Sequence, residues 1–442
     1  MKRIFCFVFA AALMLCCDKP VTPDGPVTPE TGGTPAPVFY EANPRLFAAS
    51  NRLPAIISRI DEIKALGTDV LWLMPINTYG KEKSVGSPYC IKDYRSVDPA
   101  NGTLSDLKDL VSWAHSRDMK VSMDWVANHT SWDCAWISQH KDWYTQDGKG
   151  NIVSPPGTNW TDVADLNFDN KSMRQEMIAS MVYWIKEAGI DGFRFDHVDG
   201  VPFDFWKEAL AEIKKADPDA ILLAESSDSR CFSSGFTHAF GWPSQTALKN
   251  LIQGKTDVQS YLKSIDKEAS QAPDGCLWLR FTTNHDQASE DAPATVYKNA
   301  EGALAAFVLT AFSGQSPLIY SSQELGYPSA LSFFDVRPMA WTSSYYSASL
   351  KAYKRIMASR QAAAKAITGT LKSYVSGSVL SLFWTSGDKK LFVRVNTSPS
   401  ETTVKSPMER TGEHYPYSDT GEAATVDATV TLPGYGYSIL YN

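Results

Sequence analysis

The sequence lacks the features by which several classes of protein are recognised. It has no long run of lysine or arginine and a formal net charge of −7, so nothing in it predicts nucleic acid as a partner. No cysteine spacing resembles a zinc site, and no internal repeat is present beyond the alternation of short segments described below. The N-terminal apolar run covers only residues 4–15, which is too short to span a membrane.

The composition is that of a globular protein with a sizeable core. Of 442 residues, 43% are hydrophobic and 12% aromatic. This length allows two or three domains, or one large barrel with an appendage. Sugar-binding proteins use tryptophan and tyrosine rings as stacking platforms, but ordinary packing uses the same residues. Composition alone therefore assigns no ligand.

The first 37 residues predict export and attachment to a membrane. Two basic residues precede the apolar run and two cysteines follow it, so residues 1–16 are expected to be a lipoprotein signal peptide. The stretch resembles a bacterial lipobox with Cys17 as the lipidated first residue; an ordinary cleaved signal peptide is the alternative. Residues 17–37, rich in proline and threonine, are expected to form an extended linker. The mature protein would then be lipid-anchored to a bacterial membrane, at the cell surface or in the periplasm, with its disulfide pairing left open.

Residues 38–365 alternate short apolar segments with amphipathic helical segments. The apolar, strand-like segments are 38–41, 69–74, 120–124, 192–196, 220–225, 236–240, 277–282 and 317–320. Helical periodicity occurs at 172–188, 203–215, 245–267, 300–312 and 348–365. Strands that alternate with helices form parallel sheets buried on both faces. Eight such units predict an α/β fold, a (β/α)8 TIM barrel.

Two regions depart from this alternation. Residues 130–168, between the third strand and its helix, are rich in Trp, Asp, Gly and Pro, so we expect a short inserted subdomain on the loop face of the barrel. After residue 365, strand-like segments at 379–385, 390–396, 424–432 and 437–440 are separated by turn residues. Residues 366–442 are therefore predicted to form a C-terminal antiparallel β-sandwich.

Four of the predicted strands lead into acidic residues. Asp124, Asp196 and Glu225 end the third, fourth and fifth strands, and Asp286 follows the seventh. A single Asp after a strand is usually a helix cap or a turn residue. Barrel strands, however, bring their carboxyl ends to one face, where active sites lie. Crowding acids raises the free-energy cost of ionising all of them, so a protein with no use for such a cluster would tend to avoid it. The set therefore predicts a functional site.

These acids meet the needs of glycoside hydrolysis. That reaction uses one carboxylate to attack the anomeric carbon and one protonated acid to assist the leaving oxygen. Arg194 lies two residues before Asp196 on the same strand and points to the same side, so it can keep that carboxylate ionised. Glu225 follows an apolar strand, and partial desolvation is expected to raise its pKa.

The motifs around these acids resemble those of the α-amylase family, glycoside hydrolase family 13, over nearly all of residues 38–442. The matching segments are Asp124-Trp-Val-Ala-Asn128-His129, Asp165-Leu-Asn, Gly192-Phe-Arg194-Phe-Asp196, Ala224-Glu225, Asn284-His285-Asp286 and residues 317–324, with Tyr89 in Pro-Tyr-Cys-Ile-Lys-Asp-Tyr. Each segment alone is a weak signal. Their order and spacing together are specific.

The resemblance implies a role for each matching residue. Asp196 would be the nucleophile, Glu225 the general acid/base and Asp286 the stabiliser of the transition state, with retention of configuration. The implied substrate-binding residues are Tyr89, Asp124, His129, Arg194 and His285. The implied substrates are starch and maltooligosaccharides, and other glycan-uptake proteins are candidate partners.

This chain also departs from the family pattern after the nucleophile. Many α-amylases carry Lys-His three and four residues after it, where this chain has Asp199 and Gly200, and His197 is also atypical. The family's structural calcium would use Asn128, Asp165 and the carbonyl of Gly200. Because similar motifs occur in members without the ion, calcium binding stays open, and no other cofactor is implied.

Three functions remain to be distinguished. The first is hydrolysis of α-1,4-glucosidic bonds by an endo-acting α-amylase. The second uses the same machinery in an exo-acting α-glucosidase, a neopullulanase or a glucanotransferase, which differ in subsites and water access. The third is an inactive glycan-binding relative, against which the presence of all three acids argues.

Overall fold

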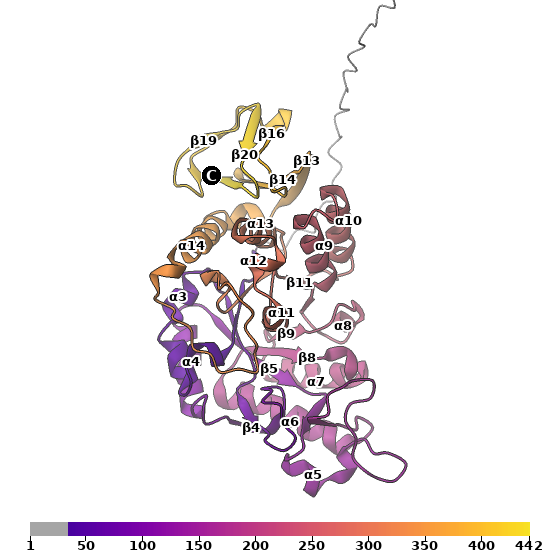
Figure 1. Cartoon of the computed structure of the whole chain (residues 1–442). Coiled ribbons are helices and arrows are strands. Elements are labelled where there is room, and N and C mark those ends of the chain that lie inside the picture. Colours follow the sequence, from indigo (N-terminus) through magenta and orange to yellow (C-terminus); the bar gives the residue numbers. More distant parts are fainter. Residues whose placement is uncertain (1–33) are drawn as a thin grey trace, which may run out of the picture.

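The computed structural model describes residues 34–442 and contains the predicted barrel (Figure 1). Within these residues, eight parallel strands close a barrel in the order β1-β12-β11-β10-β9-β8-β5-β2. The strands are β1 (Phe39–Ala42), β2 (Val70–Leu73), β5 (Lys120–Val126), β8 (Gly192–Asp196), β9 (Ile221–Ala224), β10 (His238–Phe240), β11 (Leu277–Arg280) and β12 (Ser316–Tyr320). The predicted (β/α)8 fold is confirmed.

Helices follow the barrel strands and cover the outside of the barrel. The longer ones are α4 (Leu104–His115), α6 (Lys171–Ala188), α7 (Phe203–Ala216), α9 (Trp242–Ile252), α10 (Val258–Ala269), α13 (Ala300–Ala311) and α14 (Ser347–Ala362). The shorter ones are α1 (Pro44–Phe47), α2 (Arg52–Ile57), α3 (Ile60–Lys64), α5 (Ala135–Gln139), α8 (Arg230–Ser233), α11 (His285–Glu290), α12 (Pro293–Val296) and α15 (Ala364–Ile367). Helix α4 begins at the capping box formed by Thr103 and Asp106, which satisfies its first amide groups.

The prediction of one helix over residues 245–267 is wrong, because α9 and α10 are separate helices. Gly254 has a φ of +72° just after α9, a left-handed conformation that glycine adopts without strain. Asp257 then starts a new helix by accepting a 2.7 Å hydrogen bond from the amide of Ser260. Apolar periodicity continues across the break, which is why the sequence pattern did not reveal it.

Two small antiparallel ladders follow β2 and β5. The first, β3 (Asn77–Tyr79) paired with β4 (Ile91–Val97), was not predicted, and the loop between its strands carries Tyr89. The second ladder pairs β6 (His129–Ser131) with β7 (Val163–Asp165). Helix α5 lies between these two strands in the sequence, within the predicted insertion. Both ladders follow the carboxyl ends of barrel strands, where they can contribute side chains to a site.

The C-terminal region is an antiparallel sheet in the order β13-β14-β15-β21-β18, with two smaller ladders beside it. The sheet strands are β13 (Thr370–Ser376), β14 (Val379–Ser386), β15 (Lys389–Asn396), β18 (Tyr417–Ser418) and β21 (Tyr437–Tyr441). The ladders pair β16 (Thr402–Lys405) with β20 (Thr429–Leu432), and β17 (His414–Tyr415) with β19 (Ala424–Thr425). The predicted strand over 424–432 is therefore two strands. Trp384 ties the sheet to the barrel by donating a 3.1 Å hydrogen bond to the carbonyl of Phe312 after α13.

Some predictions concern residues that the structure does not describe. The signal peptide, Cys17 and residues 17–33 of the linker lie outside the described residues. Ala36, at the end of the predicted linker, is buried, and its carbonyl accepts a 2.8 Å hydrogen bond from Arg360. Within residues 34–442, no helix has the length and apolar character needed to cross a membrane.

The interior of the barrel changes from apolar to charged along the strands. The apolar layer consists of Phe39, Val70, Trp72, Ile221, Leu223, Phe240, Leu279, Phe281 and Leu318. Inward positions recur every second residue along a strand, so the next inward residue after Phe39 is Glu41. The same alternation on β8 turns Arg194 and Asp196 inward. The charged residues therefore meet above the apolar layer, at the carboxyl ends of the strands.

Candidate active site

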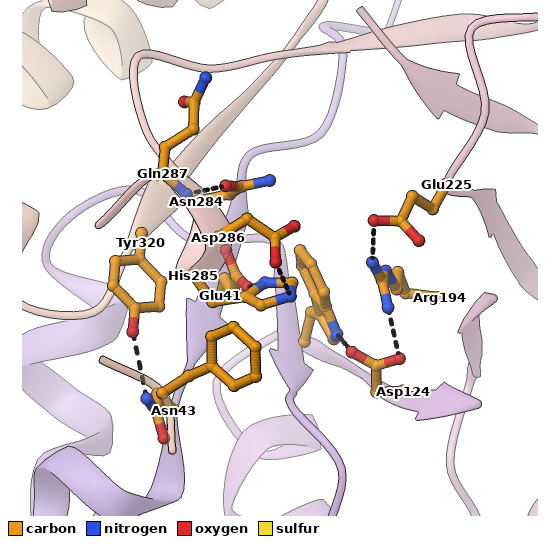
Figure 2. Close-up of polar contacts among 12 residues, drawn as sticks. Glu41, Asn43, Asp124, Arg194, Glu225, Asn284, His285, Asp286, Gln287 and Tyr320 are labelled. Carbon is orange, nitrogen blue, oxygen red and sulfur yellow. Dashed lines mark hydrogen bonds and ion pairs between the residues drawn. The ribbon is translucent and has the colours of Figure 1, made fainter. Parts of the chain in front are cut away.

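Arg194 is surrounded by acids at the carboxyl ends of the barrel strands, and Figure 2 shows it between Asp124 and Glu225. Its Nη1 pairs with Oδ1 of Asp124 at 2.8 Å and with Oδ1 of Asp196 at 2.9 Å. Its Nη2 lies 2.7 Å from Oε1 of Glu225. The guanidinium is fully buried, and a buried cation is stable only when it is paired. One side chain therefore brings together carboxyl groups from β5, β8 and the end of β9.

Three of the predicted acids remain accessible to solvent. The side chains of Asp196, Glu225 and Asp286 are 14%, 19% and 43% exposed. Asp286 lies in the first turn of α11, whose start is fixed by Asn284, which accepts a 3.0 Å hydrogen bond from the amide of Gln287. These three acids are therefore accessible to a substrate.

Glu225 is positioned to hold a proton. Its pKa is raised to about 8, mainly by burial; the charge of Arg194 opposes this shift, whereas those of Asp196 and Asp286 add to it. The backbone amide of His197 donates a 2.7 Å hydrogen bond to its Oε2. The predicted rise in the pKa of Glu225 is confirmed, and at neutral pH this residue is in the state that a general acid needs.

Tyr89 and His285 form one side of the site. Their rings stack with centroids 5.3 Å apart and an interplanar angle of 21°. The Tyr89 hydroxyl donates to Oδ2 of Asp124 at 3.1 Å and lies 2.9 Å from Nε2 of His285. On its other edge, His285 contacts Glu41 of β1, with 2.5 Å between Nδ1 and Oε1. These contacts hold both rings beside the acids.

His129, Trp160 and His197 form another side. Trp160 makes edge-to-face contacts with His129 at 5.7 Å and with His197 at 5.0 Å between ring centroids. His129 is buried, which lowers its pKa, while the charge of Asp196 opposes that shift. Trp160 is half-buried and belongs to the inserted segment, so that segment contributes an aromatic ring next to the end of β8.

Comparison with known proteins identifies the family. The sequence profile described as "Alpha amylase, catalytic domain" matches residues 44–377. The chain belongs to this α-amylase family. It is therefore a glycoside hydrolase of the retaining, double-displacement type that is general to the family.

Relatives of this family member carry several activities in their names. Alpha-amylase 3 of Dictyoglomus thermophilum is 28% identical over 352 residues, which cover 70% of this chain and 68% of that protein. A cyclomaltodextrinase of a Bacillus species is 26% identical over 342 residues, covering 72% of this chain and 60% of that protein. The solved structure of a noncanonic maltogenic alpha-amylase AmyB from Thermotoga neapolitana has a TM-score of 0.80 and 24% identity, covering 92% of this chain and 98% of its own. The last comparison shows the shared fold alone.

The predicted calcium ligands of this α-amylase family member come together. Asn128, Asp165 and Gly200 line one open pocket of about 290 Å³ beside the inserted segment. A Cβ added to Gly200 would collide with the ring of His197 and would lie 2.9 Å from Oδ1 of Asn128, so the imidazole and the amide oxygen both lie close to this glycine. Oxygen donors of these three kinds are the ligands that calcium prefers. No group of three or more His, Cys, Asp or Glu side chains that could hold a metal ion occurs within residues 34–442.

The structure also places the atypical residues that follow Asp196. Asp199 is exposed, and its Oδ1 accepts a 2.7 Å hydrogen bond from the hydroxyl of Ser226. His197 adopts a left-handed backbone conformation with a φ of 46°. Where many family members have a Lys-His pair, this chain therefore has the carboxylate of Asp199 followed by a glycine, and the imidazole nearby belongs to His197.

Sequence reasoning missed Glu41, Trp160 and Phe333. Phe333, in the loop after β12, packs edge-on against both Tyr89 and His285, at 5.7 and 5.2 Å between centroids. Glu41 carried a usable signal, because a lone acid at an inward position of an apolar strand is unusual. Trp160 and Phe333 lie in irregular loops, where no periodicity indicates which way a side chain points.

Proposed function

We propose that this protein is an endo-acting α-amylase that hydrolyses α-1,4-glucosidic bonds of starch and maltooligosaccharides. The observation that carries the proposal is the pairing of Asp196 and Glu225 with neighbouring nitrogens of Arg194. Retaining glycosidases need two carboxyl groups about 5–5.5 Å apart. Two carboxyl groups held by one guanidinium are compatible with that spacing.

In the first step, Asp196 acts as the nucleophile and Glu225 as the acid. A carboxylate oxygen of Asp196 forms a bond to the anomeric carbon while the bond from that carbon to the glycosidic oxygen breaks. Glu225 gives its proton to the departing oxygen, which leaves as a hydroxyl group on the shortened chain. The pairing of Oδ1 of Asp196 with Arg194 orients this carboxylate for attack.

In the second step, water replaces the enzyme on the sugar. Glu225, now ionised, takes a proton from water as the water oxygen attacks the anomeric carbon. The bond to Asp196 breaks, and both acids return to their starting states. Asp286 is proposed to bind sugar hydroxyls and to favour the distorted ring, and His285 and His129 are proposed to contact the sugar at the cleavage point.

Aromatic side chains on two sides of the acids support endo action. Trp160 contacts His197 next to the nucleophile strand. Beside Tyr89, Phe333 contacts the tyrosine ring and stacks on Phe334 at 4.4 Å, and Phe334 is 40% exposed. A glucan chain that extends past the cleavage point in both directions would find an aromatic surface on each side.

Calcium is proposed to be held by Asn128, Asp165 and the carbonyl of Gly200. These groups come from the end of β5, from β7 and from the segment after the nucleophile. An ion bound there would tie the inserted segment to the nucleophile strand. Its proposed contribution is structural, and it takes no part in either chemical step.

Export and a lipid anchor at Cys17 are proposed from the sequence. Starch cannot cross a membrane, so an enzyme that cuts it must act outside the cytoplasm. Incorporation of labelled palmitate by the full chain in a bacterial host, abolished by Cys17→Ser, would support the anchor. Release of an unlabelled, soluble mature protein would contradict it.

The test of the proposed activity is a time course of product sizes from amylose, pullulan and a cyclodextrin, with Asp196→Asn as the inactive control. Rapid shortening of amylose, absent in the control, is the expected result. Glucose released from intact long chains would instead indicate an exo-acting α-glucosidase. Preference for the cyclodextrin or pullulan would indicate a cyclomaltodextrinase-like or neopullulanase-like specificity, and no cleavage of any substrate would overturn the proposal.

A further inference from the structure

Glu41 is a buried acid that the mechanism above does not use. It lies at an inward position of β1 and is fully buried. Its Oε1 lies 2.5 Å from Nδ1 of His285, a residue 244 positions later in the chain. Figure 2 shows Glu41 and Asp286 on either side of the His285 ring, across the site from Glu225. Leaving an ionisable group fully buried is unfavourable unless its partner compensates, so this contact calls for an explanation.

The hydrogen-bond partners of His285 determine where its protons lie. The Tyr89 hydroxyl has one proton and donates it to Oδ2 of Asp124 at 3.1 Å. The 2.9 Å contact between that hydroxyl and Nε2 of His285 then requires Nε2 to be the donor. On the other side of the ring, Nδ1 faces a carboxylate, which only accepts. Both ring nitrogens therefore carry a proton when Glu41 is ionised.

We propose that Glu41 is a positioning residue that keeps a proton on Nδ1 of His285. Nδ1–H donates to Glu41, and the negative charge of Glu41 favours the second proton on Nε2, which donates toward Tyr89 while the Tyr89 proton is directed to Asp124. Glu41 and Asp124 are then the acceptors at the two ends of this chain of hydrogen bonds, and the charge of Glu41 supports the doubly protonated ring between them. The effect of Glu41 on catalysis rests on the proposed function, in which Tyr89, His285 and Asp286 bind the sugar.

The charges around His285 favour its protonated form. Burial by itself lowers the pKa of His285, but the charges of Asp286 and Glu41 and the hydrogen bond to Glu41 raise it to about 9, against an opposing effect of Arg194. Burial raises the pKa of Glu41, while His285 and Arg194 lower it. The remaining groups that face the pair are Asp124 on β5, Tyr89 in the loop after β3 and Tyr320 on β12.

The sign of the pH dependence follows from these shifts. The pKa of His285 in the folded protein lies above its ordinary value, so the protonated ring is present at neutral pH and is lost as the pH rises through about 9. Replacing Glu41 by glutamine keeps the size of the side chain and a hydrogen-bonding oxygen but removes the charge. His285 in that variant should lose its second proton at a lower pH.

Glu324 provides a matched control. It is also a buried glutamate in the barrel, it binds the hydroxyl of Tyr40 at 2.8 Å, and burial raises its pKa to about 7. Among the described residues, its side chain forms a hydrogen bond with Tyr40 and none with His285 or the acids of the site. Glu324→Gln therefore tests whether a buried glutamate-to-glutamine change by itself perturbs the barrel.

The decisive measurement is the nitrogen NMR titration of His285 in protein with ¹⁵N-labelled histidine, assigned by loss of its signals in His285→Gln. We expect both ring nitrogens to be protonated at neutral pH in the wild type and in Glu324→Gln. In Glu41→Gln the titration should move down by at least about one pH unit, which is a tenfold change in proton affinity. An unchanged titration in Glu41→Gln, or a wild-type ring protonated only on Nε2, would overturn the proposal.

Kinetics separate positioning from a general structural defect. In Glu41→Gln, kcat/KM on a short maltooligosaccharide should approach the wild-type value at low pH and fall at a lower pH than in the wild type. A loss by the same factor at every pH would overturn the proposed role in proton placement. The NMR titration needs no turnover, so the proton assignment can hold even if no α-glucan is cleaved. A confirmed proton assignment without cleavage of any α-glucan would overturn the proposed function and leave the role of Glu41 standing.

Discussion

The backbone amide of His197 donates a 2.7 Å hydrogen bond to Oε2 of Glu225, so the residue that follows one proposed catalytic acid binds the other. His197 achieves this with a φ of 46°, a left-handed conformation that costs a non-glycine residue about 1–2 kcal/mol. Such conformations persist where the surrounding structure determines them, and they cluster at functional sites. Asp196 and Glu225 are thus linked both through Arg194 and through the backbone.

The first prediction concerns the pH dependence of activity. The proposed acid step needs protonated Glu225, whose pKa is raised to about 8. The active form is therefore present below that pH, and kcat/KM should fall as the pH rises through it. Glu225→Gln should lower kcat by about 10²–10⁴-fold and remove this alkaline limb. Wild-type activity that stays constant through pH 8 and above would contradict the assignment of Glu225 as the acid.

The second prediction concerns the aromatic ring supplied by the inserted segment. Trp160→Ala should raise KM for maltooligosaccharides by about 5–30-fold, which corresponds to about 1–2 kcal/mol of lost apolar contact, with a smaller effect on kcat. Trp160→Phe retains a ring and serves as the control, with a KM near the wild-type value. Steady-state kinetics on a chain-length series would check both, and an unchanged KM in Trp160→Ala would exclude substrate contact.

The third prediction concerns the start of β8. Gly192 has a φ of +148°, and a Cβ added to it would lie 2.0 Å from the carbonyl oxygen of Ile221 on β9. Gly192→Ala should therefore lower the free energy of unfolding by about 2–4 kcal/mol and displace Arg194 and Asp196.

The control for this change is Gly148→Ala. A Cβ there meets no atom within 4 Å, so the free energy of unfolding should change by less than about 0.5 kcal/mol. Denaturant unfolding measures both variants. Equal stability of the two would show that β8 can shift away from Ile221 without cost.

The fourth prediction concerns the proposed calcium site. If Asn128, Asp165 and Gly200 bind the ion, chelation should lower Tm by about 3 °C, since a ligand at one hundred times its Kd stabilises the folded state by about 2.7 kcal/mol. Asp165→Asn should abolish the response to added calcium. A Tm that is equal with chelator and with calcium, in the wild-type protein, would rule out a stabilising ion at this pocket.

The barrel strands could be predicted because parallel strands buried on both faces form continuous apolar segments. The helices were predicted less well where turns interrupt an apolar pattern without ending it. Gly254 and Asp257 separate α9 from α10, yet the apolar residues on both sides keep a helical spacing. The β3–β4 hairpin was missed because its strands are short and irregularly paired, with register shifts at Thr78.

The site was predictable to the extent that its residues end barrel strands. Asp124, Asp196 and Glu225 follow apolar segments, and closure of the barrel brings such positions together whatever their separation in sequence. Trp160 and Phe333 could not be placed in this way. Their loops have no repeating geometry, and their contacts with the site depend on how each loop packs.

The sequence by itself determined the eight strands, the carboxyl ends at which the acids lie and the family to which the chain belongs, because burial and strand periodicity are local properties. Only the tertiary structure decided that Glu41 binds His285, that His197 binds Glu225 and that Arg194 pairs with three acids at once. These are hydrogen bonds and ion pairs between residues of different strands and loops. Their existence and direction depend on atomic distances that exist only after the barrel has closed.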